Sequence, residues 1–225
     1  MAAGATASEP ARFERTYTPQ GTAHLTISNV NGFIHVTAWN KRAISVSATN
    51  ASSLAIEDRM VGNDITITVK RSLKSLALGR ADFEVMVPAE TSLTLKNNMG
   101  DIEVRRVAGH ITVDSFNSDV RLADVRSSAV DVKITTGDIF FDGQLREGGS
   151  YALQSLKGNI DITVPAATPF DLNARSLSGD ISLGDFVSSF SGNTRAQRGI
   201  IGSYLNGGPR LTVTAYAGRI VLHKK

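Results

Sequence analysis

The sequence contains no cysteine, a single tryptophan and only 6% aromatic residues. The absence of cysteine excludes disulfide bonds, thiolate metal sites and cysteine nucleophiles. No run of about 18 consecutive apolar residues occurs, so we predict no transmembrane segment in this chain. No linker rich in Pro, Gly or Ser divides the 225 residues, and we therefore treat them as one domain.

Charged residues of both signs make up only 20% of the chain. Lys and Arg number 24 and Asp and Glu 21, which gives a net charge of +3, and no basic block is longer than two residues. A nucleic-acid partner is therefore not expected. The hydrophobic fraction of 41% is ordinary for a folded domain and excludes disorder over most of the length.

One short pattern recurs along the chain: a turn residue, a polar residue and then an apolar–any–apolar triplet. Its positions are nine to twelve residues apart over much of the chain, which suits one five-residue strand and a tight turn, with two strands per coil. A meander of hairpins shares this spacing but needs no such uniform phase. We predict an all-β fold, a single β-helix-like β-solenoid of about ten short coils with little or no helix. The pattern begins with glycine at Gly32, Gly100, Gly109, Gly137, Gly158, Gly179 and Gly218.

In a solenoid the two apolar residues of each unit point inward and stack from coil to coil, and the turn glycine recurs at a corner that needs a positive φ or a close approach of backbone. The residues predicted to point inward are Ile102, Val104, Ile111, Val113, Val120, Leu122, Val130, Val132, Ile139, Phe141, Ile160, Ile162, Ile181, Leu183, Ile220 and Leu222.

The ends of the chain are less regular than its middle. We predict a flexible N-terminus over residues 1–20 and the solenoid over residues 21–225. Gly62-Asn63, between two apolar alternations, predicts a hairpin, and residues 72–80 a loop. The long step after Gly179 predicts an irregular coil or a loop over residues 188–199. Trp39 is expected to cover one end of the solenoid.

The polar residue that follows the turn is acidic in several units, which makes it the first candidate for a site. Stacked coils would place these carboxylates about 5 Å apart, where each pair repels by roughly 0.8 kcal/mol. We predict that turn N–H groups donate hydrogen bonds to them; a cation or a basic partner along this edge is the alternative. The slot holds Asp101, Asp119, Asp138, Asn159, Asp180 and Arg219.

No catalytic, cofactor or metal site is predicted. The sequence has no H-E-x-x-H, nucleophile elbow, phosphate loop or calcium repeat, and His24, His35, His110 and His223 are expected at the surface. A carbohydrate-active enzyme is the alternative from another class. Its best acid–base pair is Asp131 with Asp171, which point outward and are expected two coils apart, near the upper limit for such a pair. A sugar-stacking platform is the other option, formed by Trp39, Tyr151, Tyr204 and Tyr216.

Three segments carry a resemblance to a known family. They are NVNGFIHVTAW (29–39), FEVMVP (83–88) and residues 201–222, with serial G-D-I units between them. Over about residues 20–222 the chain resembles the bacterial putative adhesin family, LiaG-like β-solenoid domains of unknown function. The resemblance implies an exported or envelope-attached bacterial protein without catalytic residues.

We therefore expect a non-enzymatic, adhesin-like protein of the cell envelope or surface, with extended β-faces that bind a polysaccharide or another protein. No cofactor is expected. Self-association through the open solenoid ends is expected, because unpaired edge strands favour it. The alternatives are a carbohydrate-active β-helix enzyme and an envelope-stress accessory protein.

The resemblance also predicts an extracytoplasmic location, in the periplasm, attached to the envelope or secreted, with a signal peptide removed. The first ten residues are small and polar, which fits a mature exported chain behind an added Met1 as well as an ordinary disordered terminus. If the protein is exported, its native gene encodes an apolar segment immediately upstream of Ala2. Reading the gene checks this, and a stop codon with no such segment upstream contradicts it.

Overall fold

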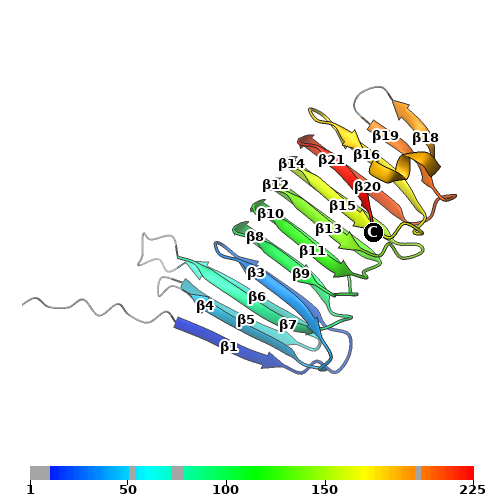
Figure 1. The fold of residues 1–225 in the computed structure, drawn as a ribbon. Coiled ribbons are helices and arrows are strands. Elements are labelled where there is room, and N and C mark those ends of the chain that lie inside the picture. The colour runs from blue at the N-terminus through cyan, green and yellow to red at the C-terminus, as the bar shows by residue number, and fades with distance from the viewer. Residues whose placement is uncertain (1–10, 51–53, 72–78, 196–198) are drawn as a thin grey trace, which may run out of the picture.

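Two long β-sheets packed face to face form an elongated rod, shown in Figure 1. The computed structural model describes residues 11–50, 54–71, 79–195 and 199–225. Sheet A has ten strands, in the spatial order β1 (Ala11–Tyr17), β4 (Ile44–Asn50), β7 (Ala81–Pro88), β3 (Ile34–Trp39), β9 (Ile102–Arg105), β11 (Val120–Val125), β13 (Ile139–Gly143), β15 (Ile160–Val164), β21 (Ile220–Lys224) and β17 (Ile181–Ser182).

Sheet B has eleven strands, and one 3-10 helix, η1 (Gly184–Ser189), lies at the C-terminal end of the rod. In spatial order the strands of sheet B are β18 (Phe190–Arg195), β19 (Gly199–Tyr204), β16 (Phe170–Ser176), β20 (Arg210–Ala217), β14 (Ser150–Lys157), β12 (Ala129–Thr136), β10 (Ile111–Asn117), β8 (Ser92–Met99), β2 (His24–Asn29), β6 (Asp64–Arg71) and β5 (Leu54–Val61).

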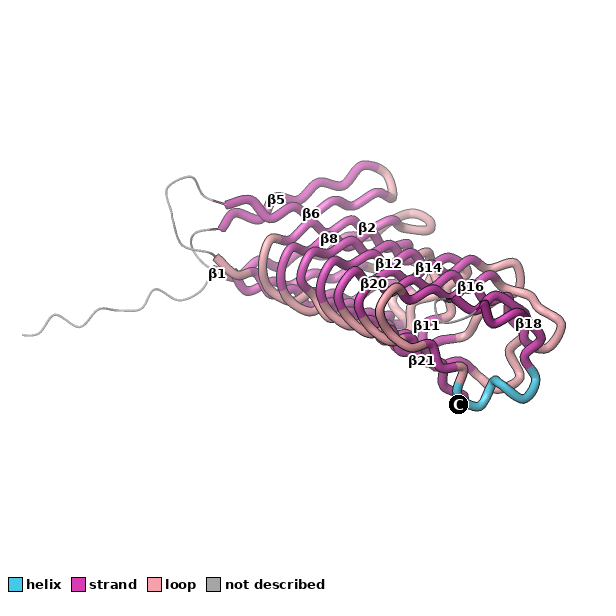
Figure 2. The backbone as a smooth tube through the Cα atoms, turned by 90° about the horizontal axis from the view of Figure 1, so that it is seen from above, coloured by secondary structure: helices cyan, strands magenta, loops and turns pink. Residues whose placement is uncertain are grey.

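Each coil gives one strand to each sheet, and the coils stack as parallel hoops in Figure 2. In the middle of the rod β8–β9, β10–β11, β12–β13 and β14–β15 stack in sequence order, and each strand pairs in parallel with its counterpart in the next coil. The predicted all-β solenoid with two strands per coil is therefore confirmed.

The number and order of the coils differ from the prediction. The described chain forms eight two-stranded coils, fewer than the expected ten or so, because both ends of the chain form antiparallel strands instead. The β2–β3 coil lies between β6–β7 and β8–β9, and the β20–β21 coil lies between β14–β15 and β16–β17. All coils carry the same pattern and can pair in parallel on either side, so sequence order alone does not decide which coils become neighbours.

The residues predicted to point inward form the core between the two sheets. All of them are buried except Ile181, which is half-buried. Ile181 belongs to β17, the edge strand of sheet A, where no further coil covers it. The prediction of the core is thus confirmed, and its one departure follows from the end of the stack.

Glycine recurs at one corner because successive coils approach closely there. Gly158 has φ = +151°, and a Cβ at this position would lie 1.8 Å from the carbonyl oxygen of Gly137 in the neighbouring coil. Side chains are excluded at such a distance. Gly32, Gly100, Gly179 and Gly218 also meet a backbone carbonyl of a neighbouring coil at the same corner, so its predicted role is confirmed.

The N-terminal end of the rod is closed by antiparallel strands. β1 pairs with β4, so residues 11–17 belong to sheet A and the flexible segment expected over residues 1–20 is too long; residues 1–10 lie outside the described residues. The Tyr17 hydroxyl donates to Oδ2 of Asp58 on β5 at 2.9 Å, which ties the edge strands of the two sheets together. Burial and this hydrogen bond raise the pKa of Tyr17 well above its usual range.

Aromatic side chains close the C-terminal end. Phe186 of η1, Phe170 and Tyr204 form a cluster with ring centroids 4.8 to 5.4 Å apart, and all three are buried. Lys224 Nζ lies 4.9 Å from the Phe186 ring centroid. The predicted irregular region over residues 188–199 is the end of η1 followed by the β18–β19 hairpin, with residues 196–198 outside the described residues.

Two further predictions concern the N-terminal half. The hairpin at Gly62-Asn63 is confirmed, since Val61 pairs with Asp64 at the end of the antiparallel β5–β6 ladder. Of the loop expected over residues 72–80, residues 72–78 lie outside the described residues. The expectation for Trp39 is wrong, because β3 lies inside sheet A with a strand on each side. Trp39 Nε1 donates to the Ala43 carbonyl, so the ring covers a turn of the rod.

The corner contact predicts different costs for two glycine substitutions. Gly148 has φ = +68° with no atom within 4 Å of an added Cβ, so Gly148→Ala should lower the free energy of unfolding by about 1 kcal/mol from backbone strain alone. Gly158→Ala adds a clash with the Gly137 carbonyl and should cost about 3 kcal/mol or more. Urea unfolding of both variants measures this, and equal costs would contradict the close approach.

Candidate functional site

The acidic column at the corner is a ladder of side-chain-to-backbone hydrogen bonds. Asp119 Oδ1 accepts from the Asp138 N–H at 2.8 Å, and Asp138 Oδ1 accepts from the Asn159 N–H at 2.6 Å. Asn159 Oδ1 in turn accepts from the Arg219 N–H at 3.1 Å. The prediction that turn N–H groups donate to these side chains is confirmed at three positions. Each bond joins one coil to the next.

The real order of the coils also changes the charge of this column. Arg219 lies between Asn159 and Asp180, and Phe33 lies between Asp82 and Asp101, so the run of adjacent like charges is limited to Asp101, Asp119 and Asp138. Among the described residues no group of three or more His, Asp or Glu is placed to hold a metal ion. The acidic column therefore has a structural role, because its hydrogen bonds join neighbouring coils. Its geometry does not favour the alternative of a bound cation.

A second ladder, inside the same corner, was missed by the sequence reasoning. Asn97 Nδ2 donates to the Gly32 carbonyl at 2.8 Å, and Ser155 Oγ donates to the Gly137 carbonyl at 3.1 Å. Ser176 Oγ donates to the Gly218 carbonyl at 2.9 Å. These buried side chains thereby find acceptors on the inner side of the corner, as buried polar groups require. The sequence contains a pattern that could have predicted this ladder: a small polar residue stands two positions after the apolar–any–apolar triplet.

The outer face of sheet A carries a shallow groove beside the acidic column. Its volume is about 240 Å³, and four neighbouring coils contribute to it. The outward residues of β3, β9, β11 and β13 stand in register at its base, because the parallel pairing aligns them. We call it the sheet A groove; it is lined by His35, Asp101, Ile102, Glu103, Asp119, Arg121 and Phe140.

Aromatic rings and charges alternate along this groove. The Arg121 guanidinium lies 4.7 Å from the Phe140 ring centroid, and the Phe33 ring stacks on His35 at 4.2 Å. Nδ1 of His35 lies 3.0 Å from the Glu84 carboxylate. Carboxylates accept hydrogen bonds, guanidinium groups donate them and aromatic rings offer apolar surface. Such a mixture can bind a ligand that has both hydroxyl groups and C–H faces.

The outer face of sheet B does not bring the proposed acid–base pair together. Asp131 lies in the column of outward residues that continues through Ala152, Thr212 and Asn173. Asp171 lies on the same strand as Asn173, two residues before it, and pairs with Arg210. The two carboxylates are therefore in different columns and three strands apart. The predicted separation of two coils is therefore wrong, because β20 inserts between β14 and β16.

Both carboxylates have structural partners on this face. Asp171 Oδ1 accepts from the Ser203 hydroxyl at 2.5 Å, and its Oδ2 accepts from the Gly208 N–H at 3.3 Å, which holds the turn before β20. Asp131 Oδ2 pairs with Lys133 Nζ at 3.0 Å. The geometry offers these two residues no shared reaction centre.

The remaining candidates are scattered. His24, His110 and His223 are exposed as predicted, and His35 is half-buried in the sheet A groove. Tyr151 and Tyr204 are buried. They lie on β14 and β19, away from Trp39 on β3, so the four-residue aromatic platform does not form.

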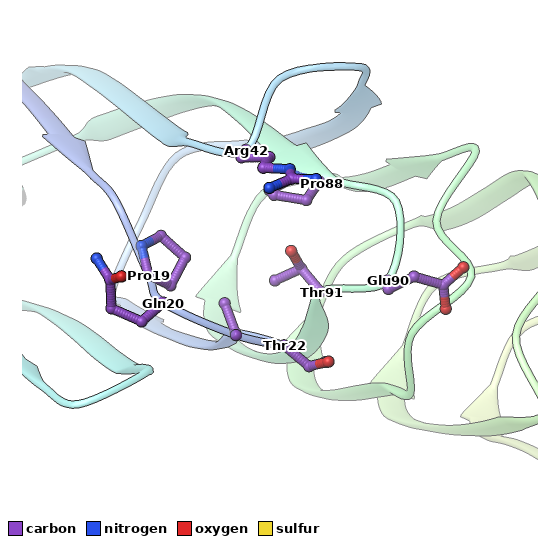
Figure 3. Close-up of a pocket in the computed structure, with 9 residues that line it drawn as sticks. Pro19, Gln20, Thr22, Arg42, Pro88, Glu90 and Thr91 are labelled. Carbon is purple, nitrogen blue, oxygen red and sulfur yellow. The ribbon is translucent and has the colours of Figure 1, made fainter.

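A hollow of about 270 Å³ lies at another corner, near the N-terminal end (Figure 3). Arg42 and Pro88 lie on one side of it and Pro19 and Gln20 on another, and Thr91 lies between Pro88 and Thr22 in this view. The described residues that line it include one basic and one acidic side chain and no aromatic ring. It therefore lacks the mixture of groups that distinguishes the sheet A groove.

Comparison with known proteins gives a consistent picture of the fold. A model of the Toastrack DUF4097 family matches the chain twice, over residues 22–144 and residues 92–223. The overlap is expected for a repeat, since similar coils can be aligned in more than one register. No curated protein matches the chain. Among the described residues no helix is long and apolar enough to cross a membrane.

A solved structure with the same fold has low sequence identity to this chain. A "putative cell adhesion protein" from Clostridium sporogenes is 13% identical, with a TM-score of 0.57, and the match covers 96% of this chain and 100% of that one. A "putative adhesin" from Bacteroides fragilis is 11% identical, with a TM-score of 0.48 and coverage of 96% and 100%. At this identity the first structure supports the fold alone.

The acidic ladder predicts which carboxylates stabilise the rod. Asp138→Ala leaves the Asn159 N–H without its acceptor and should cost about 1 kcal/mol, whereas Asp138→Asn keeps an acceptor oxygen and should cost less. The carboxylate of Asp101 accepts no hydrogen bond from a described neighbouring coil, and its main-chain carbonyl, which accepts from the Ile34 N–H, is kept in Asp101→Ala, so this variant is the matched control and should be nearly neutral. Thermal unfolding with hydrogen exchange at the Asn159 amide measures the effect. Equal losses in the two alanine variants would contradict the ladder.

Proposed function

Because this chain belongs to the Toastrack DUF4097 family, whose model matches it from residue 22 to residue 223, we propose that it is a non-enzymatic, adhesin-like protein of the cell envelope or surface. In this proposal the outer face of sheet A binds a polysaccharide through the sheet A groove. We propose an extracytoplasmic location for the same reason. The name of the Clostridium sporogenes neighbour, a putative cell adhesion protein, is in keeping with both.

The observation that carries the proposal is the composition of the sheet A groove. Glu103 and Asp119 offer acceptors for sugar hydroxyl groups, Arg121 offers donors, and Phe140 offers an apolar surface for the C–H face of a sugar ring. These residues stand on neighbouring strands of a hydrogen-bonded sheet, so little ordering is needed on binding.

The shape of the face favours a polymer over a small solute. Ten strands at about 4.8 Å each give sheet A a length of roughly 45 Å, and the groove is open to the rest of this face. A long, rigid surface can contact many repeating units of one chain. A polysaccharide meets that requirement with the chemistry that the groove offers.

The carboxylates near the groove are engaged in ways that suit binding better than catalysis. Glu103 Oε1 accepts from Arg105 at 2.7 Å, and Asp119 holds the Asp138 N–H of the next coil. A general acid needs a carboxyl group whose pKa is raised by its surroundings. The engaged carboxylates and the separation of Asp131 from Asp171 support the non-enzymatic proposal.

The proposal predicts that binding depends on the groove and not on sheet B. Arg121→Ala and Phe140→Ala should each weaken binding to a recognised polysaccharide tenfold or more, since Arg121 supplies the hydrogen-bond donors of the groove and Phe140 its apolar surface. Asp131→Ala, on the opposite sheet, is the control and should bind normally. A glycan array followed by titration with the best polysaccharide provides the measurement.

The same polysaccharides should be assayed for new reducing ends or unsaturated products. Binding without turnover, lost in the two groove variants, supports the proposal. Turnover would instead favour the carbohydrate-active enzyme. Absence of both would contradict a polysaccharide ligand and leave a protein partner or an accessory role in the envelope.

A further inference from the structure

A row of exposed apolar side chains crosses the strands of sheet B near their C-terminal ends. Phe116 is 64% exposed, Leu156 41%, Tyr216 43% and Leu177 56%. The register of β10, β12, β14, β20 and β16 places them in one column, with Thr135 between Phe116 and Leu156. These four residues, called here the apolar row, form a line interrupted by Thr135, on a face where most outward positions are polar. Such a line is a candidate interface.

A hollow lies at one end of the apolar row. Its volume is about 470 Å³, and Tyr216 and Leu177 line it together with Thr214, Ala215, Gln154, Arg175 and Ser176. Phe116 lies at the other end of the row, four strand spacings or about 19 Å away. A phenyl ring fits within such a volume. One face thus carries both a protruding aromatic ring and a recess able to receive one.

We propose that two copies of this chain pack sheet B against sheet B in antiparallel orientation, about a two-fold axis that runs along the strand direction at β14. This operation reverses the order of the coils and keeps each column opposite itself. Phe116 of each copy then enters the hollow of the other, and Leu156 meets Leu156 near the axis. Isologous interfaces require this kind of self-complementarity, with matching features at equal distances from the axis.

Charges beside the apolar row agree with the same axis. The neighbouring column holds Asp114 on β10 and Arg175 on β16, at the same two strands as the ends of the row. Both are exposed, and neither forms an ion pair with a described residue. The two-fold operation places Asp114 of one copy opposite Arg175 of the other, twice per dimer.

The residues between these charges also meet acceptable partners. Lys133 lies opposite Thr214 and Gln154 opposite Gln154, so no like charges face each other in this column. A parallel packing about an axis along this column would place Asp114 opposite Asp114 and Arg175 opposite Arg175. Opposed like charges disfavour such a complex, so the charge pattern favours the antiparallel arrangement over that one.

The expected dimer is weak and leaves the sheet A groove free. The apolar row is short compared with obligate interfaces, so dimerisation should depend on concentration. Sheet A of each copy faces away from the partner, on opposite sides of the pair. The dimer does not require the proposed polysaccharide function, but it would make that binding bivalent and raise avidity for a polymer.

Sedimentation equilibrium over a concentration series tests the dimer. Phe116→Asp should raise the dissociation constant at least tenfold, whereas Val187→Asp, which changes an equally exposed residue on η1, should leave it unchanged. Both side chains are 64% exposed, so both variants should fold, and circular dichroism checks this. A wild-type chain that stays monomeric up to millimolar concentration, or equal losses in both variants, would overturn the proposal.

A charge exchange tests the two-fold axis itself. Asp114→Arg and Arg175→Asp should each weaken the dimer about tenfold by creating like-charged pairs, and the double variant D114R/R175D should return to within threefold of wild type. The two residues lie four strands apart within one copy, so recovery has to come from contact between copies. A double variant that stays as weak as the single ones overturns the antiparallel register.

Discussion

The close approach of neighbouring coils at the glycine corner sets the geometry of the whole rod. A Cβ on Gly158 would lie within 1.8 Å of a carbonyl oxygen, so most coils have glycine at this turn position, and Ala81 and Ser118 occupy it in the other two. The approach brings Asp138 within hydrogen-bond distance of the next backbone N–H on the outside, and Ser155 within reach of a glycine carbonyl on the inside. Two polar ladders therefore depend on one steric condition, and they hold the strands of both sheets in register.

That register explains how a site arises from residues far apart in the sequence. His35 and Glu103 stand side by side although 68 positions separate them, because β3 pairs with β9. The groove on sheet A and the apolar row on sheet B are each assembled from several coils, and each coil contributes one side chain to a column. A rod of this kind has two independent faces, and a ligand on one need not disturb a partner on the other.

The ends of the rod require a different solution from its middle. An open coil leaves a row of unpaired N–H and C=O groups, and proteins usually cover such edges. Here β1 and β5 are linked by Tyr17 and Asp58 at one end, and the cluster around Phe186 closes the other. These features cover the core at both ends, while β1 and β5 remain the outermost strands of their sheets, and self-association through the ends stays a prediction.

The sequence by itself determined the repeat, the core and the corner. Apolar pairs such as Ile139 and Phe141 are spaced regularly, and a glycine precedes them. Both features can be read from the sequence alone, and the structure confirms the burial of the pair and the close approach at the glycine. Only the tertiary structure decided the order of the coils. All coils present the same parallel hydrogen-bonding edge, so the repeat does not specify which coils become neighbours. In the fold β20 lies between β14 and β16, and Asp131 and Asp171 do not meet. In the sheet A groove only the place of His35 depended on that order, since Glu103, Arg121 and Phe140 lie on coils that stack in sequence order. The hollow beside Tyr216 exists only because β20 lies between β14 and β16.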